Sequence, residues 1–359
     1  MNTREVELLA AESITTLGTK TIDLGLQNPV SRLDIMWRKT NSNRTPIAHP
    51  GKIVESIDLV DGSDVLFSMN GQDAQAMEYF TSGKQPGSMI NYETGQWSMQ
   101  IASIPFGRFL WDEMYALDPR RFNNIQLKIK HNIALGGATG TVGDLSVYAH
   151  VWDDKVVQPK GFLLTKEQYS FLPVASAWVY VDLPTDFPIR CMMFGANECE
   201  QGPEYNINKF KLTENEGKSI VIESAMERYL LVASQNYNMW QEKVLFKTAA
   251  AATDLSFYAS PHWERTYEGH VEGTAYATAV VSAAGCLYKL QNATAAAIIE
   301  GFAMGHAPFG QTFLPFGDLE GVEYWDIQKA ASGKLSLLAD ASCDVDEYVR
   351  VFVQQVRDY

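Results

Sequence analysis

Short apolar segments separated by turn residues dominate the chain. In the clearest of these segments, apolar and polar side chains alternate, which is typical of a half-buried β-strand. These are residues 125–130, 145–152, 335–338 and 348–353. Clusters of Asn, Ser, Asp and Gly separate such segments, for example at 41–43 and 61–63. The pattern predicts an all-β chain of many short strands, as in a sandwich, a barrel or a jelly roll.

Landmarks of the first half return in the same order in the second half. Thr-Ile-Asp-Leu at 21–24 matches Tyr-Val-Asp-Leu at 180–183, and a proline follows each Asp after six residues, at Pro29 and Pro188. Further matches pair 32–37 with 189–194, 57–59 with 210–212, 76–79 with 225–229, and 104–107 with 314–317. Each copy then closes on a pair of alternating strands. The ordered matches indicate a duplicated β module.

Three segments depart from the strand pattern. Apolar residues at 6, 9, 10 and 14 have helical spacing behind a possible N-cap at Thr3, so a short amphipathic helix is expected at the N-terminus. Helical spacing also predicts short helices at 73–80 and 220–233. The second copy is longer than the first because of an insertion around 245–305, rich in Ala, Thr, Gly and Ser, which we expect at the surface.

Composition excludes several classes of protein. With 359 residues, 46% of them hydrophobic and 20% charged, the chain is globular and long enough for about two domains. A net charge of −14 without a basic cluster argues against direct nucleic-acid binding. Residues 1–20 lack the features of a signal peptide, and the apolar stretch 274–288 is too short to span a bilayer, so a soluble protein is expected.

Candidate metal and redox chemistry is sparse. The four cysteines (Cys191, Cys199, Cys286, Cys343) form no CxxC motif, which favours a reduced compartment and excludes a common zinc or redox motif. The best metal-ligating group is His262, Glu264, His270 and Glu272 in the insertion. A polar loop that makes subunit contacts is the favoured interpretation of that group. We therefore assign no metal or cofactor residue.

Candidate catalytic chemistry is equally sparse. The glycine-rich residues 136–143 lack the lysine of a phosphate-binding loop and lie between predicted strands, so a strand connection is favoured. The nucleophile motif Gly-x-Ser-x-Gly is absent. Paired carboxylates at 153–154, and at 198 with 200, could act as a glycosidase pair, but a solvated surface is the default. No catalytic residue is assigned, and the chain is not expected to be an enzyme.

Tryptophans could form a sugar-binding surface by stacking on the ligand. Trp97, Trp152 and Trp178 lie in alternating segments, so core packing is the favoured interpretation for them. Trp263 lies in the insertion and is the one tryptophan expected to be exposed.

The landmarks resemble those of double jelly-roll major capsid proteins of icosahedral, membrane-containing viruses and bacteriophages. The resemblance rests on Pro-Phe-Gly at 105–107 and 315–317, the Ile-x-Leu strand before a short helix, the closing strand pair and the C-terminal run 349–357. It covers about residues 20–359 and implies two tandem eight-stranded jelly rolls. The expected domains are an N-terminal helical arm (1–20), a first jelly roll (21–155), a linker (156–178), and a second jelly roll (179–359) with a tower insertion (245–305).

The resemblance also implies a function and partners. It implies a major capsid subunit that forms homotrimeric, pseudo-hexameric capsomers, made in the host cytoplasm and located in the virion. The implied partners are the chain itself, neighbouring capsomers, vertex (penton) proteins, minor capsid or membrane proteins and an underlying lipid membrane, without direct nucleic-acid contact and without a cofactor. Two alternatives stay open. One is a two-jelly-roll glycan-binding or glycan-hydrolysing protein with Trp263, Glu264 and Glu272 at a cleft rim, and the other is a trimeric phage tail or spike protein.

Overall fold

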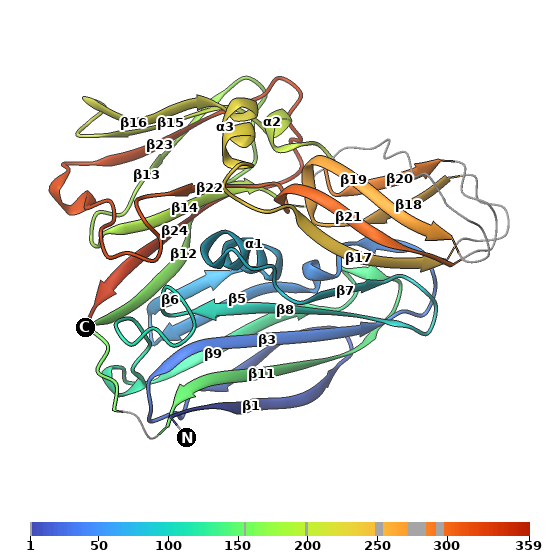
Figure 1. Cartoon of the computed structure of the whole chain (residues 1–359), viewed down its shortest axis with the longest axis horizontal. Helices are drawn as coiled ribbons and strands as arrows, with labels where there is room; N and C mark the ends of the chain where they lie inside the picture. The colour runs from blue at the N-terminus through green and yellow to red at the C-terminus, as the bar shows by residue number, and fades with distance from the viewer. Residues whose placement is uncertain (1, 154–155, 198–199, 248–253, 272–284, 292–297) are drawn as a thin grey trace.

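Strands dominate the computed structural model, which describes residues 2–153, 156–197, 200–247, 254–271, 285–291 and 298–359 (Figure 1). Two sheets of eight strands, one of four strands and two of two strands account for them. Figure 1 shows one barrel in the lower part of the molecule, a second above it, and a sheet that projects to one side.

The first barrel has eight strands in two four-stranded layers. One layer has the order β1-β11-β3-β8 and the other β2-β9-β5-β6. The strands are β1 (Thr3–Ile14), β2 (Leu17–Asp23), β3 (Val30–Thr40), β5 (Val54–Asp61), β6 (Asp64–Met69), β8 (Trp97–Pro105), β9 (Ile125–Asn132) and β11 (Val142–Trp152). Alternate residues of β9 (Ile125, Leu127 and Ile129) are buried in the core between the layers. Burial of one face therefore explains the alternation seen in the sequence.

The second barrel repeats this arrangement with layers β12-β24-β14-β22 and β13-β23-β15-β16. Its strands are β12 (Gly161–Phe171), β13 (Trp178–Asp182), β14 (Ile189–Ala196), β15 (Ile207–Glu214), β16 (Ser219–Ala225), β22 (Gln311–Pro315), β23 (Gly333–Ala339) and β24 (Val349–Asp358). Its core includes Phe194, Phe210, Leu212 and Val351.

The sequence repeat coincides with equivalent strands of the two barrels. Residues 57–59 lie on β5 and 210–212 on β15, the third strand in each layer β2-β9-β5-β6 and β13-β23-β15-β16. Residues 104–107 and 314–317 lie where β8 and β22 end, at corresponding edges of the other layers. The prediction of two tandem eight-stranded jelly rolls is confirmed.

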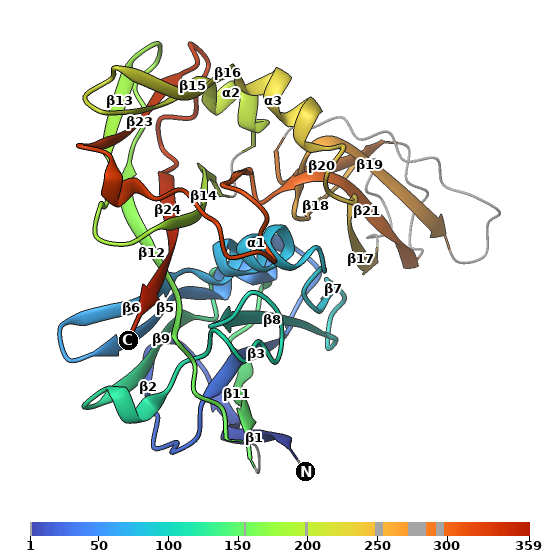
Figure 2. The ribbon, with the colours of Figure 1, turned by 60° about the vertical axis from the view of Figure 1, so that its left-hand side comes forward.

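A β-junction joins the barrels. Strand β6 of the first barrel pairs in parallel with β12 of the second, through Phe67 opposite Thr165 and Ser68 opposite Lys166. One eight-stranded sheet, β2-β9-β5-β6-β12-β24-β14-β22, therefore runs through both barrels (Figure 2).

The insertion of the second half adds three strands to a sheet of the first barrel and also forms a separate two-stranded sheet. It contains β17 (Trp240–Lys247), β18 (Asp254–Tyr258), β19 (Pro261–Val271), β20 (Leu287–Gln291) and β21 (Ile298–Pro308). Strand β17 pairs in parallel with β7 (Ser88–Asn91), which itself pairs with β8. The insertion thus spans more than the expected 245–305, and of that range residues 248–253, 272–284 and 292–297 lie outside the described residues.

Helices and short elements close the barrels. Helix α1 (Gly71–Ser82) confirms the helix predicted at 73–80; the Asn70 side chain caps it by accepting a hydrogen bond from the Asp73 amide at 2.7 Å. The remaining elements are α2 (Pro203–Asn206), α3 (Met226–Ala233), the 3-10 turns η1 (Pro50–Ile53), η2 (Pro119–Arg121) and η3 (Ile327–Lys329), and the short pair β4 (Pro46–Ala48) and β10 (Gly137–Ala138). Within the described ranges, none of the helices has the length and apolar character that crossing a bilayer requires.

The N-terminal helix predicted within residues 1–20 is wrong. Residues Thr3–Ile14 form β1, which pairs with β11 at the edge of the first barrel. The pairing register shifts twice, between Glu7 and Leu9 and between Leu9 and Glu12. Each irregularity changes which face a residue occupies, so Val6, Leu9 and Ile14 all reach the core side, whereas Ala10 is exposed. This spacing imitates a helix.

Two further boundaries differ from expectation. Residues 156–178, expected to be a linker, contain β12, the first strand of the second barrel. The first five residues of β12 are all buried, and such a strand shows no alternation. In the helix expected at 220–233, the β-branched run Ile220-Val221-Ile222 belongs to strand β16, and the helix begins only at Met226.

Candidate interaction surfaces and buried polar clusters

Aromatic packing fixes the junction between the barrels. The ring of Phe80 on α1 stacks on that of Phe313 on β22, with centroids 5.0 Å apart and planes 8° from parallel. Tyr237 packs edge-on against both rings. Helix α1 of the first barrel is thereby held against a sheet of the second.

A buried carboxylate reinforces this junction. An Oδ atom of Asp73 on α1 accepts a hydrogen bond from the Gln311 side chain at 3.0 Å, and the other lies 3.3 Å from the Arg350 guanidinium. Burial raises the pKa of Asp73 to about 6, although Arg350 acts in the opposite direction. The polar contacts satisfy the carboxylate at a site that excludes water.

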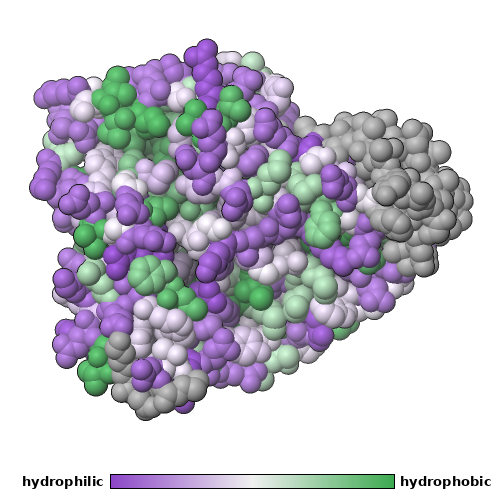
Figure 3. Space-filling view, in the orientation of Figure 1, coloured by the Kyte–Doolittle hydropathy of each residue, from purple (hydrophilic) through white to green (hydrophobic). Residues whose placement is uncertain are grey.

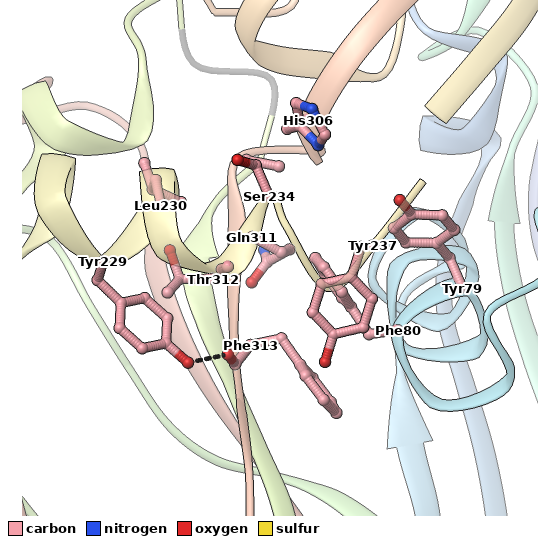
Figure 4. A pocket seen from close by; sticks show the side chains of 12 residues that line it. Tyr79, Phe80, Tyr229, Leu230, Ser234, Tyr237, His306, Gln311, Thr312 and Phe313 are labelled. Atoms are coloured by element: carbon pink, nitrogen blue, oxygen red, sulfur yellow. Dashed lines mark hydrogen bonds between the residues drawn. The ribbon is translucent and has the colours of Figure 1, made fainter. Parts of the chain in front are cut away.

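A small pocket lies along the same junction (Figure 4). Its lining comes from α1, α3, β21, β22 and the segment after α3, with Tyr79, Phe80, Tyr237 and Phe313 gathered around it. The Tyr229 hydroxyl is directed to the backbone, donating to the Phe313 carbonyl at 2.7 Å. The lining is mostly aromatic and apolar and continues the contact between the barrels.

A second buried cluster attaches the insertion to the first barrel. The Nε2 atom of His49 lies 3.1 Å from Oε1 of Glu242 on β17, and neither side chain is exposed to solvent. Glu242 also accepts hydrogen bonds from the Ser88 hydroxyl at 3.0 Å and the Ser260 amide at 2.8 Å. Burial acts to raise the pKa of Glu242, but the neighbouring His49 and Ser260 outweigh it and hold that pKa below its ordinary value.

Ser260, His49 and Glu242 resemble a catalytic triad in composition but differ from one in geometry. In a triad the acid contacts one ring nitrogen and the nucleophile the other. Here both the Ser260 hydroxyl, at 3.2 Å, and Glu242 approach Nε2, while Nδ1 accepts a hydrogen bond from the Gly51 amide at 2.9 Å. All three residues are fully buried. The cluster is suited to joining two parts of the chain, and sequence motifs gave no sign of it.

The candidate metal group is not assembled in the described residues. His262 is buried, its Nδ1 lies 2.7 Å from the Ser260 carbonyl, and burial lowers the pKa of His262 to about 3. Glu264 is exposed. The backbone of His270 lies on β19, whereas Glu272 falls outside the described residues. Among the residues that the structure describes, no group of three His, Cys, Asp or Glu could hold a metal ion.

The carboxylate pairs are only partly described. Asp153 lies 3.2 Å from the Arg4 guanidinium in an ion pair at the surface, and its neighbour Asp154 lies outside the described residues. Glu198 is likewise outside them, so the expectation that Glu198 and Glu200 belong to a solvated surface stays a prediction.

The burial of the tryptophans agrees only partly with the expectation from sequence. Trp152 is buried as expected, and Trp97 is half-buried under the Arg38 guanidinium. The expectation of core packing is wrong for Trp178, which is 38% exposed on the edge strand β13. The expectation of exposure is wrong for Trp263, which is half-buried and packs against the core of the second barrel.

The glycine-rich residues 136–143 form a strand connection, as predicted. Gly137–Ala138 is β10, and β11 begins at Val142. The ammonium group of Lys39 donates a hydrogen bond to the carbonyl of Gly136. That contact directs a carbonyl inward, whereas a phosphate-binding loop directs amide groups toward its ligand.

Among the strands that end a sheet in the described chain, β16 and β1 lie at opposite ends of the molecule. Strand β16 ends one four-stranded layer, and β1 ends the layer of the first barrel. On β16, Ile220 is 53% and Val221 40% exposed, and on the adjoining α3, Leu231 is 55% and Val232 59% exposed. Figure 3 shows hydrophobic side chains gathered over β16 and beside α3. An exposed apolar edge of this kind invites pairing with another chain.

Comparison with solved structures gives matches over nearly the whole chain. The structure of the STIV major capsid protein aligns with a TM-score of 0.59 and 11% identity, covering 99% of this chain and 97% of that one. The chain has the double jelly-roll fold of such capsid proteins. The major capsid protein P2 of bacteriophage PM2 aligns with a TM-score of 0.53 and 11% identity, covering 99% and 98%. The capsid protein VP54 of PBCV-1 gives 0.55 and 9%, covering 99% and 94%.

These identities are low, so the likeness establishes the fold. No family model matches the sequence, and no curated protein matches it. The resemblance inferred from the Pro-Phe-Gly elements and the duplicated strands is confirmed at the level of the fold. Pro105-Phe106-Gly107 and Pro315-Phe316-Gly317 close the strands β8 and β22 in the two barrels.

Proposed function

We propose that the chain is the major capsid subunit of an icosahedral virus and acts as a structural protein. The observation that carries the proposal is the alignment of two tandem jelly rolls with viral capsid proteins over 99% of the chain. The buried polar clusters fit this role, because they join parts of the chain and are closed to solvent.

The proposed assembly is a homotrimer. Each chain supplies two barrels of the same strand order, so three chains present six similar barrels around one axis. Such a ring has a near-hexagonal outline and can occupy a six-coordinated position of a shell. The insertion sheet, which projects from the barrels in Figure 1, is the proposed tower.

Further partners follow from a place in the shell. We propose neighbouring capsomers, vertex (penton) proteins, minor capsid or membrane proteins and an underlying lipid membrane, with the subunit made in the host cytoplasm and located in the virion. Direct nucleic-acid contact is not proposed, because the net charge of −14 disfavours phosphate binding.

The mass of the purified protein in solution tests the proposal. Three chains of 40.0 kDa give about 120 kDa, and larger particles are expected at high concentration. A stable monomer of 40.0 kDa at micromolar concentration, without larger particles, would contradict the proposal. A glycan-binding monomer would favour the alternative, although Trp263, on which that alternative relied, is half-buried and packs against the core of the second barrel.

A further inference from the structure

The junction between the two barrels leaves one matching pair of edges unused. Within the chain, β6 of the first barrel pairs with β12 of the second. Strand β16 occupies in the second barrel the place that β6 has in the first, and β1 occupies in the first barrel the place that β12 has in the second. Both strands end their sheets, and they lie at opposite ends of the molecule (Figure 1).

From this we infer that β16 of one copy pairs in parallel with β1 of the next copy, repeating the junction inside the chain. The inference rests on the proposed trimer and specifies its interface. A contact between two different surfaces generates a closed ring when its rotation closes. Three junctions within chains and three between chains would then link six barrels by continuous β-pairing.

The equivalence of the two barrels also predicts which residue of β16 takes part in the proposed pairing. In the first barrel, Ser68 of β6 lies opposite Asp58 of β5, the middle residue of Ile-Asp-Leu. In the second barrel, Glu223 of β16 lies opposite Lys211, the middle residue of the matching Phe-Lys-Leu. Glu223 is therefore the equivalent of Ser68.

The two prolines of the repeat determine which residue of β1 takes part in the pairing. Leu33 and Met192 each stand four residues after the matching prolines, Pro29 and Pro188. The structure supports this alignment, because β3 and β14 begin one residue after each proline, and each begins with an isolated antiparallel bridge. The sequence match of 32–37 with 189–194 is displaced from this alignment by two residues. Leu33 lies opposite Ala149, which lies opposite Val6 of β1.

The same path in the second barrel leads to β12. Met192 lies opposite Val353, which lies opposite Lys166. Val6 is therefore the equivalent of Lys166. Because Ser68 lies opposite Lys166 within the chain, Glu223 of one copy should lie opposite Val6 of the next.

The exposed apolar residues around β16 are consistent with a second copy of the chain bound there. Helix α1 is buried against the second barrel through Phe80, whereas the equivalent helix α3 leaves Leu231 and Val232 exposed. A second copy would cover these side chains together with Ile220 and Val221 of β16, at the same place where the second barrel covers α1.

Disulfide trapping tests the register directly. Val6→Cys and Glu223→Cys would place two cysteines opposite each other on neighbouring strands. The strands would lie about 4.8 Å apart, which is within the range of Cα separations that a disulfide allows. The background carries Cys199→Ser, while Cys191, Cys286 and Cys343 are buried. Under oxidation the double variant should form covalent dimers and trimers that reduction separates. Each single variant, and Thr19→Cys with Glu223→Cys as a matched pair on a different strand, should stay monomeric on a denaturing gel.

The mass of the unoxidised protein distinguishes the two proposals. Trimers that form without the Val6–Glu223 cross-link would overturn the pairing of β16 with β1 and leave the proposed capsid function standing. A chain that stays monomeric would overturn both. A second variant, Leu231→Asp with Val232→Asp, changes exposed residues only and should lower the trimer fraction at least tenfold at micromolar concentration without changing the circular dichroism spectrum; an unchanged trimer fraction would count against the interface.

Discussion

The imidazole of His49 and the carboxylate of Glu242 meet at 3.1 Å inside the protein, although they belong to different halves of the chain. His49 caps η1 beside the first barrel, and Glu242 lies on β17 of the insertion. The pair therefore fastens an insertion of the second half to the first barrel. Together with the β6–β12 junction, the pair connects the two halves of the chain at two separate places.

Loss of the Glu242 carboxylate should destabilise the protein strongly. Glu242→Ala leaves His49 and the Ser260 amide buried without their partner, and breaking such a buried pair costs about 3–5 kcal/mol. Denaturant unfolding at fixed protein concentration measures the loss. Glu300→Ala is the control, because Glu300 lies on the same insertion with its side chain half exposed, and an exposed ion pair contributes about 1 kcal/mol at most. Equal losses in both variants would contradict a special role of the buried pair.

The ring of Phe313 should be a major contributor to the packing of the barrels. Phe313→Ala removes the stack on Phe80 and leaves a cavity, for which about 3–5 kcal/mol of unfolding free energy is expected to be lost. Phe302→Ala, at a ring that is 46% exposed, should lose much less. Thermal and denaturant unfolding of both variants would decide, and comparable losses would argue against the stacked contact as a determinant of the junction.

The pH dependence of stability should reveal Glu78. Burial raises the pKa of Glu78 from 4.5 to about 7. The folded state therefore holds more protons than the unfolded state between these values, and wild-type stability falls as pH rises through them. Glu78→Gln removes this titration, so the variant should gain stability relative to wild type from pH 5 to pH 8, by roughly 2 kcal/mol. A difference that stays constant over this range would show that Glu78 titrates normally.

Deletion of residues 2–14 should unfold the first barrel. Strand β1 pairs with β11 and contributes the buried Ile14, so its loss opens a sheet and exposes the core. We expect an insoluble protein, or one that loses cooperative thermal unfolding. A soluble deletion variant with an unchanged melting temperature would mean that this segment is a dispensable arm.

Sequence patterns predicted the fold where one face of a strand is buried and the other solvated, as in β9. They failed where the alternation of apolar and polar residues along a strand is interrupted or hidden. Bulges changed the phase of β1, burial on both faces hid β12, and the outward face of an edge strand carries Trp178.

The buried clusters were beyond sequence reasoning. His49 and Glu242 are 193 residues apart, and only the parallel pairing of β17 with β7 brings them together. The spacing of individual residues carries no signal of such a contact, whereas the duplicated landmarks revealed the two barrels because each copy repeats them in order.

Electron microscopy of the purified, concentrated chain tests the central claim most directly. Class averages should show six similar densities around a threefold axis, two from each chain. Averages that show isolated particles with two densities would contradict the account of the chain as a trimeric shell subunit.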